Sequence, residues 1–278
     1  AAGQAAFRKL ETGDKEMRKM WSSFVDVTKS AMADVYSRLS VAFDTDRGES
    51  YYEDKMEPIV EEGKKKGVFK PGEKGALIVE FPEDTNMPPA FVMKADGATL
   101  YLTRDLALMR DRVENWHPSA ILWAVDVAQQ LYSKQLFATA AMLGWELPVL
   151  EHIYFGRMRF ADGGMSTRKG NILKLEHVLD EAVSRAADVI KERGEAIQTD
   201  DPADLAEMMG VGALIYGILS QNRKMDITFD WDKMLSFEGN SAPYLQYTHA
   251  RAQSILRKAD GKVSALDEGT ALTEKDRA

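Results

Sequence analysis

The residues best suited to chemistry lie in one loop, Asp162 to Asn171, which reads DGGMSTRKGN. Three glycines give this loop conformational freedom, its hydroxyl groups can donate hydrogen bonds, and Arg168 with Lys169 adds two positive charges. Such a loop suits nucleotide phosphates, where charged donors stabilise negative charge that develops on a leaving group. It is not a Walker loop, because the lysine precedes Gly170 and no Gly-Lys-Ser/Thr follows. On composition alone, a flexible surface loop with a basic tip is the alternative.

The elements around this loop predict a βαβ unit. Ala120 to Val127 is a nearly continuous apolar run, which is typical of a strand buried on both faces of a parallel sheet. A helical pattern follows over Ala128 to Leu143 and is closed by Gly144, and a second strand is expected over His152 to Phe160. Open sheets built from such units bind ligands at the carboxyl ends of their strands, and the loop follows the second strand directly.

The remaining pattern divides the chain into an α/β half and a helical half. An Asp-Gly pair at Asp96 separates two short apolar stretches, Phe91 to Lys94 and Thr99 to Thr103, and predicts a β-hairpin. Beyond the basic loop the pattern is mostly helical. One helix is expected to start at Asp201, which precedes a proline, and another to span Ser241 to Lys258.

Composition excludes several classes of protein and site. The 278 residues are 45% hydrophobic and 29% charged, as in ordinary globular proteins. A net charge of -8 argues against coating nucleic acid by bulk charge, although it leaves room for a local basic groove. The absence of cysteine excludes disulfides, thiolate zinc sites and cysteine nucleophiles, and four scattered histidines offer little to a transition metal. We expect no membrane segment and a cytoplasmic location.

The ends of the sequence suggest an excised piece of a longer protein. The chain begins with Ala-Ala-Gly-Gln rather than methionine and stops in a polar run, Glu268 to Ala278.

Several segments together resemble one enzyme family. MSTRKGN, from Met165 to Asn171, resembles the Lys-Met-Ser-Lys-Ser signature loop of class I aminoacyl-tRNA synthetases, in the form seen in arginyl-tRNA synthetases. Four further segments resemble that family in the same order, so the resemblance covers nearly the whole chain. They are ESYYEDKM (Glu49 to Met56), DGATLYLTRDLA (Asp96 to Ala107), VDxxQ at Val125 to Gln129 with QLF at Gln135 to Phe137, and PYLQYTHARAQSIL (Pro243 to Leu256).

The resemblance implies an α/β fold. The expected architecture is the second half of a class I Rossmann-like nucleotide-binding domain with an inserted hairpin and helical region, followed by an α-helical segment that begins the anticodon-binding bundle. Residues 1–175 would form the catalytic domain with its insertion over 1–95, residues 176–238 a helical connective region, and residues 239–278 the start of the bundle.

The resemblance also implies an activity. The parent enzyme would be an arginine-tRNA ligase, which condenses arginine with ATP to arginyl-adenylate and transfers arginine to the 3′ end of its tRNA. The implied ligands are L-arginine, ATP with Mg²⁺, and the tRNA for arginine. No zinc and no resident metal site are implied, and we expect a monomer.

The resemblance assigns the arginine substrate to Tyr101, Asp105 and Gln129. This is chemically sensible, because a carboxylate accepts two hydrogen bonds from a planar guanidinium and a phenol adds a hydrogen bond or a stacking face. The alternatives from the residues alone are a carboxylate in a first helical turn for Asp105 and a half-buried strand aromatic for Tyr101.

The resemblance assigns further residues to nucleotide and tRNA. For Asp126, a cap that orders the end of the strand is the alternative to contact with the nucleotide. Packing between helices is the alternative for most of the tRNA candidates. The ATP-binding residues are Asp126, Met165, Ser166, Thr167 and Arg168; the catalytic ones are Ser166, Arg168 and Lys169; and the tRNA candidates are Tyr244, Tyr247 and Arg251, with Gln246 and His249 beside them.

Two departures from the family pattern stand out. Gly164 and Thr167 occupy the places of the two signature lysines. The second class I signature, His-x-Gly-His, is absent from the sequence, so we expect a fragment that lacks the upstream part and is inactive alone. That absence keeps open two other functions, a non-catalytic tRNA-binding or interaction module and another class I nucleotidylyl transferase.

Overall fold

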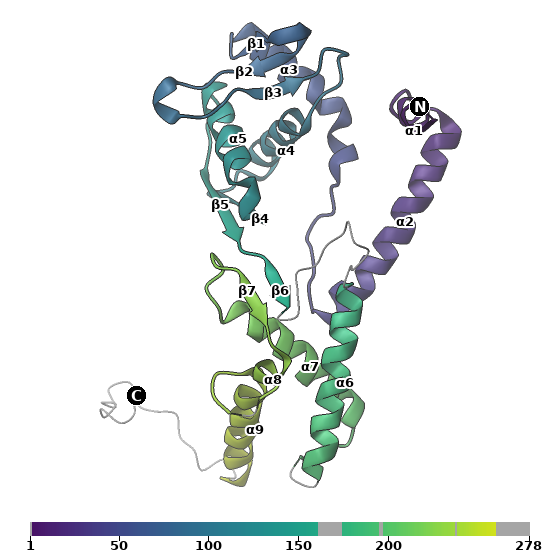
Figure 1. The fold of residues 1–278 in the computed structure, drawn as a ribbon, viewed down its shortest axis with the longest axis vertical. Coiled ribbons are helices and arrows are strands. Elements are labelled where there is room, and N and C mark those ends of the chain that lie inside the picture. Colours follow the sequence, from purple (N-terminus) through teal and green to yellow (C-terminus); the bar gives the residue numbers. More distant parts are fainter. Residues whose placement is uncertain (1, 161–173, 195–196, 237, 260–278) are drawn as a thin grey trace. The chain divides into compact units, whose positions relative to one another are not determined.

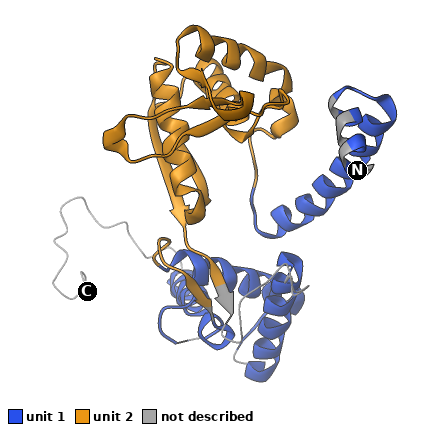
Figure 2. Cartoon of the chain, turned by 45° about the horizontal axis from the view of Figure 1, so that its top comes forward, with its two compact units in different colours: residues 1–41, 160–221, 229–278 blue, residues 42–159, 222–228 orange. Residues whose placement is uncertain are grey.

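The computed structural model describes residues 2–160, 174–194, 197–236 and 238–259. The chain forms two compact units. Unit 1 comprises residues 1–41, 160–221 and 229–278, and unit 2 comprises residues 42–159 and 222–228 (Figure 2). The arginine-site candidates all fall in unit 2. The three-part division expected from the sequence stays a prediction.

Unit 2 contains the predicted βαβ unit (Figure 1). Strand β4 (Ala120–Asp126) leads through a short 3-10 turn, η4 (Val127–Gln129), into helix α5 (Gln130–Met142), and β5 (Val149–Phe155) returns parallel to β4. Ala120 pairs with Val149 and Asp126 with Phe155, so both strands end at the same edge. The predicted parallel connection is therefore confirmed. Burial of the first strand on both faces is not: Ile121 is the one buried residue of β4, and Leu122 is 61% exposed, because among the described residues β4 pairs with β5 alone in a two-stranded sheet.

The second predicted strand is shorter than expected. It ends at Phe155, and a separate strand, β6 (Met158–Phe160), pairs instead with β7 (Ile227–Phe229). The break occurs at Gly156, where a Cβ atom would lie 2.2 Å from the carbonyl oxygen of Met225. The 222–228 segment thus approaches so closely that position 156 requires glycine, and this contact separates β5 from β6.

The β-hairpin predicted around Asp96 is only partly confirmed. Strand β3 (Ala90–Met93) is present, but the return stretch contributes a single bridge, from Thr99 to Met93. Helix α4 (Tyr101–Trp116) begins where the sequence predicts a strand. Leu102, Leu106 and Met109 follow helical spacing and are almost fully buried, and this apolar face outweighs the strand preference of the first residues.

A small antiparallel sheet packs beside α4. Its order is β1-β2-β3, with β1 (Phe69–Pro71) and β2 (Leu77–Val79) preceding β3. Two helical elements precede this sheet in the sequence: a 3-10 helix, η1 (Glu49–Lys55), and helix α3 (Met56–Lys65). Short 3-10 turns η2 (Glu73–Gly75) and η3 (Glu83–Thr85) join the strands. The core of the unit comprises Tyr52, Ile59, Val79, Val92, Leu106, Met109, Leu136 and Leu143, all at most 2% exposed.

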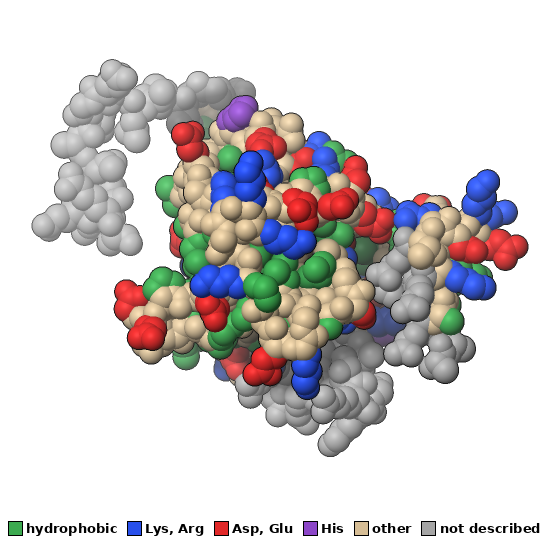
Figure 3. Space-filling model, turned by 90° about the horizontal axis from the view of Figure 1, so that it is seen from above, with side chains coloured by type: hydrophobic (Ala, Val, Ile, Leu, Met, Phe, Trp, Pro, Cys, Tyr) green, Lys and Arg blue, Asp and Glu red, His purple; other side chains and the backbone are tan. Residues whose placement is uncertain are grey.

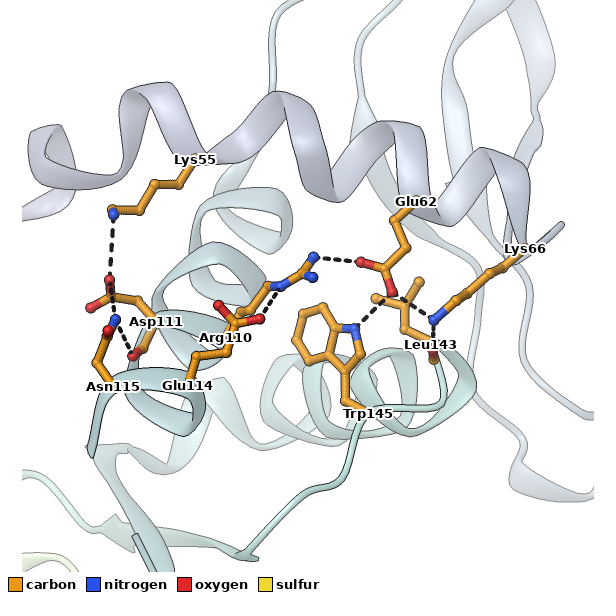
Figure 4. Close-up of polar contacts among 9 residues, drawn as sticks. All are labelled: Lys55, Glu62, Lys66, Arg110, Asp111, Glu114, Asn115, Leu143 and Trp145. Atoms are coloured by element: carbon orange, nitrogen blue, oxygen red, sulfur yellow. Dashed lines mark hydrogen bonds and ion pairs between the residues drawn. The ribbon is translucent and has the colours of Figure 1, made fainter. Parts of the chain in front are cut away.

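Ionic networks tie α3 and η1 to α4 (Figure 4). Burial alone would raise the pKa of Glu62 on α3. However, this carboxylate accepts hydrogen bonds from Lys66, the Trp145 indole and Arg110, and these contacts outweigh burial, so the pKa of Glu62 is lowered. Asp111 on α4 has a side chain only 3% exposed and pairs with Lys55 at 3.4 Å. These contacts fix α4, which carries two of the predicted site residues.

Unit 1 is helical in the part that the structure describes, apart from the ends of β6 and β7 that it shares. Asp201 caps α7 through its side chain, as the sequence predicts, and Ser241, expected as the first residue of a helix, instead caps α9. Arg38 of α2 bonds to Asp180 at 2.7 Å and Glu207 at 2.8 Å, which links three helices. The helices are α1 (Ala2–Glu11), α2 (Lys15–Arg38), α6 (Leu175–Arg193), α7 (Pro202–Leu219), α8 (Trp231–Met234) and α9 (Ala242–Lys258).

Helix α7 is long and apolar enough to cross a membrane by length and composition, with a mean hydropathy of 1.3 over 18 residues. A core helix of a globular protein passes the same test. In the structure 33% of this window is buried, including Ala206, Met209 and Leu214, and α7 packs against α6. Elsewhere the surface is mixed: acidic and basic side chains are interspersed on the face drawn in Figure 3.

Candidate functional site

Helix α4 presents two of the predicted arginine-site residues on one side. Tyr101 is its first residue and Asp105 lies four residues later, so the two side chains neighbour each other across one helical turn. Tyr101 is 65% exposed, which corrects the alternative of a half-buried strand aromatic. A ligand can therefore reach the Tyr101 ring.

Asp105 is bound by a phenol that sequence analysis did not assign. The Tyr132 hydroxyl, on α5, donates a short hydrogen bond to Oδ2 of Asp105. Burial raises the pKa of the Asp105 carboxyl from its ordinary value of 3.8, against the lowering effect of that hydrogen bond. Burial and the neighbouring carboxylate raise the pKa of Tyr132 as well, so its hydroxyl stays protonated and remains a donor.

A second carboxylate faces the same residues from the segment before α3. Glu49 accepts a hydrogen bond from Nη1 of Arg104 at 2.6 Å. Its negative charge adds to the upward shift of the pKa values of both Asp105 and Tyr132. Arg104 also places its guanidinium carbon 5.9 Å from the centre of the Tyr101 ring. Two carboxylates, two phenols and one resident guanidinium thus form a single electrostatic cluster.

The carboxyl end of β4 carries the other predicted residues. Asp126 accepts a hydrogen bond from the backbone N–H of Ala128 at 2.7 Å, so the alternative role as a strand-end cap is confirmed. That bond and the Arg157 guanidinium, 3.2 Å from Oδ2, lower the pKa of Asp126. Its contact with nucleotide stays a prediction.

Gln129 lies at the start of α5, three residues before Tyr132. It is exposed, and its backbone carbonyl accepts a hydrogen bond from Ser133 Oγ at 3.1 Å. Because Tyr132 bonds to Asp105, the structure brings Gln129 to the same region as the α4 residues. The roles of Gln129, Tyr101 and Asp105 in arginine binding stay predictions.

The residues predicted to contact phosphate belong to the Asp162 to Asn171 loop. Met165, Ser166, Thr167, Arg168 and Lys169 all lie outside the described residues. In the part of the chain that the structure does describe, no cluster of three or more histidine or acidic side chains could hold a metal ion.

The tRNA candidates occupy one side of α9. Tyr244, Tyr247 and Arg251 follow the three-and-four spacing of a helix, and all three are exposed. Tyr244 is 45% and Tyr247 is 52% exposed, so these rings are available for stacking. Gln246 instead donates to the carbonyl of Met208 at 3.1 Å and serves packing between α9 and α7. The tRNA role of the exposed residues stays a prediction.

Sequence reasoning missed two members of the cluster. Glu49 lies in the ESYYEDKM segment, which contributed to the resemblance without a role for any residue. Tyr132 lies one turn after Gln129, so a scan of the helix for phenols near the strand end could have found it. Their meeting with α4 depends on tertiary packing, which spacing alone does not reveal.

Comparisons with known proteins all indicate one family. Residues 2–231 match the family model described as tRNA synthetases class I (R), catalytic domain. An arginine–tRNA ligase of Fusobacterium nucleatum is 43% identical over 274 residues, which is 99% of this chain and 48% of that protein. One from Chloroflexus aurantiacus is 41% identical over 96% of this chain and 45% of its own length. The chain therefore spans about half the length of the curated relatives that it matches.

Solved structures support the fold. The arginyl-tRNA synthetase of Plasmodium falciparum superposes with a TM-score of 0.80 at 22% identity, covering 94% of this chain and 44% of that one. The arginyl-tRNA synthetase of Thermus thermophilus gives a TM-score of 0.72 at 20% identity over 97% of this chain and 50% of its own. The mixed α/β fold is thus similar to that of these enzymes.

Proposed function

Because this chain belongs to the class I arginyl-tRNA synthetase family, we propose that the protein carrying it is an arginine–tRNA ligase. It would use ATP, as its magnesium complex, to activate L-arginine and would transfer the arginyl group to the 3′ end of its tRNA. The finer organisation belongs to the same proposal: a Rossmann-like half domain over 1–175, a connective region over 176–238 and the start of an anticodon-binding bundle over 239–278. So do the monomeric state and the cytoplasmic location.

The observation that carries the proposal is the cluster formed by Asp105, Tyr132, Tyr101 and Glu49. One oxygen of Asp105 accepts the Tyr132 hydroxyl, which orients the carboxylate and leaves acceptor capacity for the two parallel donors of a guanidinium. Tyr101 offers an exposed ring for stacking on the guanidinium plane. A planar, permanently charged side chain satisfies all these groups, whereas an ammonium satisfies only the charge.

The chemistry would depend on positioning and charge. The α-carboxylate of arginine attacks the α-phosphate of ATP, the bond to the β-phosphate oxygen breaks, and pyrophosphate leaves. Ser166, Arg168 and Lys169 would stabilise the charge on the transferring phosphate, while Asp126, Met165 and Thr167 would contact ATP. A ribose hydroxyl at the tRNA 3′ end then attacks the arginyl carbonyl and AMP leaves. Tyr244, Tyr247 and Arg251 would contact tRNA through stacking and phosphate pairing.

The test is isotope exchange between pyrophosphate and ATP, measured on the full-length protein that carries this chain, with tRNA present. We expect exchange that depends on L-arginine and not on lysine or citrulline. Binding of tRNA without any exchange would instead favour the non-catalytic tRNA-binding module. Exchange that does not require arginine would favour another nucleotidylyl transferase.

A further inference from the structure

Arg104 already occupies contacts suited to a substrate guanidinium. Its Nη1 lies 2.6 Å from Glu49 Oε2, and its guanidinium carbon lies 5.9 Å from the centre of the Tyr101 ring. Its side chain is only 24% exposed, and its Nε is buried without a hydrogen-bond partner. The chain thus places one of its own guanidinium groups between a carboxylate and a phenol of the candidate site, in an incompletely satisfied position.

We infer that Arg104 is a resident competitor of the substrate, which fills part of the guanidinium site when arginine is absent and withdraws from Glu49 when arginine binds. The inference rests on the proposed arginine site. Because the site is competent only in the fraction of molecules from which Arg104 has withdrawn, the apparent dissociation constant for arginine is raised by the inverse of that fraction. Arg104 would therefore set the substrate affinity without contacting the reacting atoms.

The balance of charge favours this exchange. Glu49 and Asp105 bring two negative charges to the cluster, and Arg104 neutralises one of them. Arg112 also acts on Asp105, since its positive charge lowers the pKa of that carboxyl, but its guanidinium lies 5.4 Å from the centre of the Trp123 ring instead of pairing with Glu49. When a substrate cation enters, it takes over the neutralising role, and Arg104 no longer has to stay beside Glu49.

Glu49 is held in place independently of Arg104. Arg47 and Lys55, on either side of it in the chain, both pair with the buried Asp111, at 2.7 Å and 3.4 Å. Arg47 also stacks on the Tyr51 ring, 4.8 Å from its centre. The segment that carries Glu49 is thus bound to α4 through two ion pairs, so Glu49 remains at the site when the Arg104 side chain withdraws. The flexible arginine side chain is the part able to move.

The experiment compares L-arginine binding by the full-length wild type and by Arg104→Gln, using isothermal titration calorimetry. We expect Arg104→Gln to bind arginine about three to twenty times more tightly, as the loss of one partly exposed ion pair and one cation–π contact suggests. Lys70→Gln is the matched control: it breaks an exposed ion pair with Glu80 elsewhere in unit 2 and leaves Glu49 and Asp105 untouched, so we expect the dissociation constant for arginine to change less than about twofold. In a Glu49→Gln background, Arg104→Gln should bring no gain, because the pair is already broken.

A second measurement follows the wild-type protein itself and needs a conservative variant only to assign the signal. The Nε–H resonance of Arg104, assigned with Arg104→Lys, should shift when L-arginine is added and should not shift with lysine. Weaker or unchanged arginine binding by Arg104→Gln, or an Arg104 resonance that saturating arginine leaves in place, would overturn the inference while the proposed function stands. A wild type that binds no arginine would remove both.

Discussion

The most informative perturbation is Asp105→Asn, because the structure predicts opposite effects on ligand binding and on stability. The substitution keeps the shape of the side chain and an oxygen that can accept the Tyr132 hydroxyl. It removes the negative charge and one acceptor. A hydrogen bond to a charged group contributes about 1.5–3 kcal/mol, so the loss to a bidentate guanidinium should be about 2–4 kcal/mol. This corresponds to an arginine dissociation constant about 30 to 900 times higher.

Stability should move the other way. The pKa of Asp105 is raised in the folded protein, chiefly by burial, so the folded state binds this proton more tightly than the unfolded chain. The favourable contribution is complete below the unfolded pKa and is lost as pH rises through the folded pKa. At neutral pH the ionised carboxylate therefore costs stability. Asp105→Asn should leave the melting temperature unchanged or raise it.

The assay pairs calorimetry for L-arginine and for ATP with thermal unfolding at neutral pH, on the full-length protein. ATP affinity should change less than about threefold, because the substitution lies on the arginine side of the proposed site. Equal losses for arginine and ATP would refute the reasoning, as would a drop in melting temperature large enough to explain the lost binding. Glu114→Gln, at an exposed position later on α4, serves as the control for a lost carboxylate.

Four further predictions test the proposed arginine site and the contacts that stabilise the fold. Tyr132→Phe should raise the KM for arginine about three- to tenfold with little change in kcat, because it removes only the hydroxyl that orients Asp105; an equal fall in kcat would argue against an orienting role. Arginine affinity should fall on acidification at a higher pH than an ordinary aspartate with a pKa of 3.8 would allow, since the pKa of Asp105 is raised, and calorimetry across the acidic range checks this. Asp111→Ala should lower the free energy of unfolding in urea by about 2–4 kcal/mol, because Arg47 and Lys55 lose a buried partner, whereas exposed Asp54→Ala should not. Gly156→Ala should cost about 1–3 kcal/mol by forcing the backbone near Met225 apart, and Gly48→Ala, which meets no neighbour, should be close to neutral.

Local patterns predicted the elements whose residues determine their own structure. The apolar run from Ala120 to Val127 has the length of a strand, and the strand forms, although it is not buried on both faces as its composition predicted. The Asp201-Pro202 pair marked a helix start because capping depends on adjacent residues. These features hold in the structure because tertiary packing agrees with local preference.

The failures occur where residues outside the segment considered decide its structure. The stretch from Thr99 to Thr103 has strand-forming residues, yet burial of Leu106 and Met109 later in the chain extends the helix back to Tyr101. The pairing of Arg104 with Glu49 joins residues 55 positions apart, and no spacing rule reveals it. Asp105 was identified from the family resemblance, while its partner Tyr132 appears only when α4 packs against α5.

The discontinuity of unit 2 has a consequence for the newly made polypeptide. Gly156 donates its N–H to the carbonyl of Arg223 at 2.8 Å, and Ile227 donates to Arg157 at 2.9 Å. Translation proceeds at about 5–20 residues per second, so the 156–160 segment waits several seconds for these partners to emerge. Until then these backbone groups lack their native partners, and unpaired strand edges of this kind are prone to non-native association.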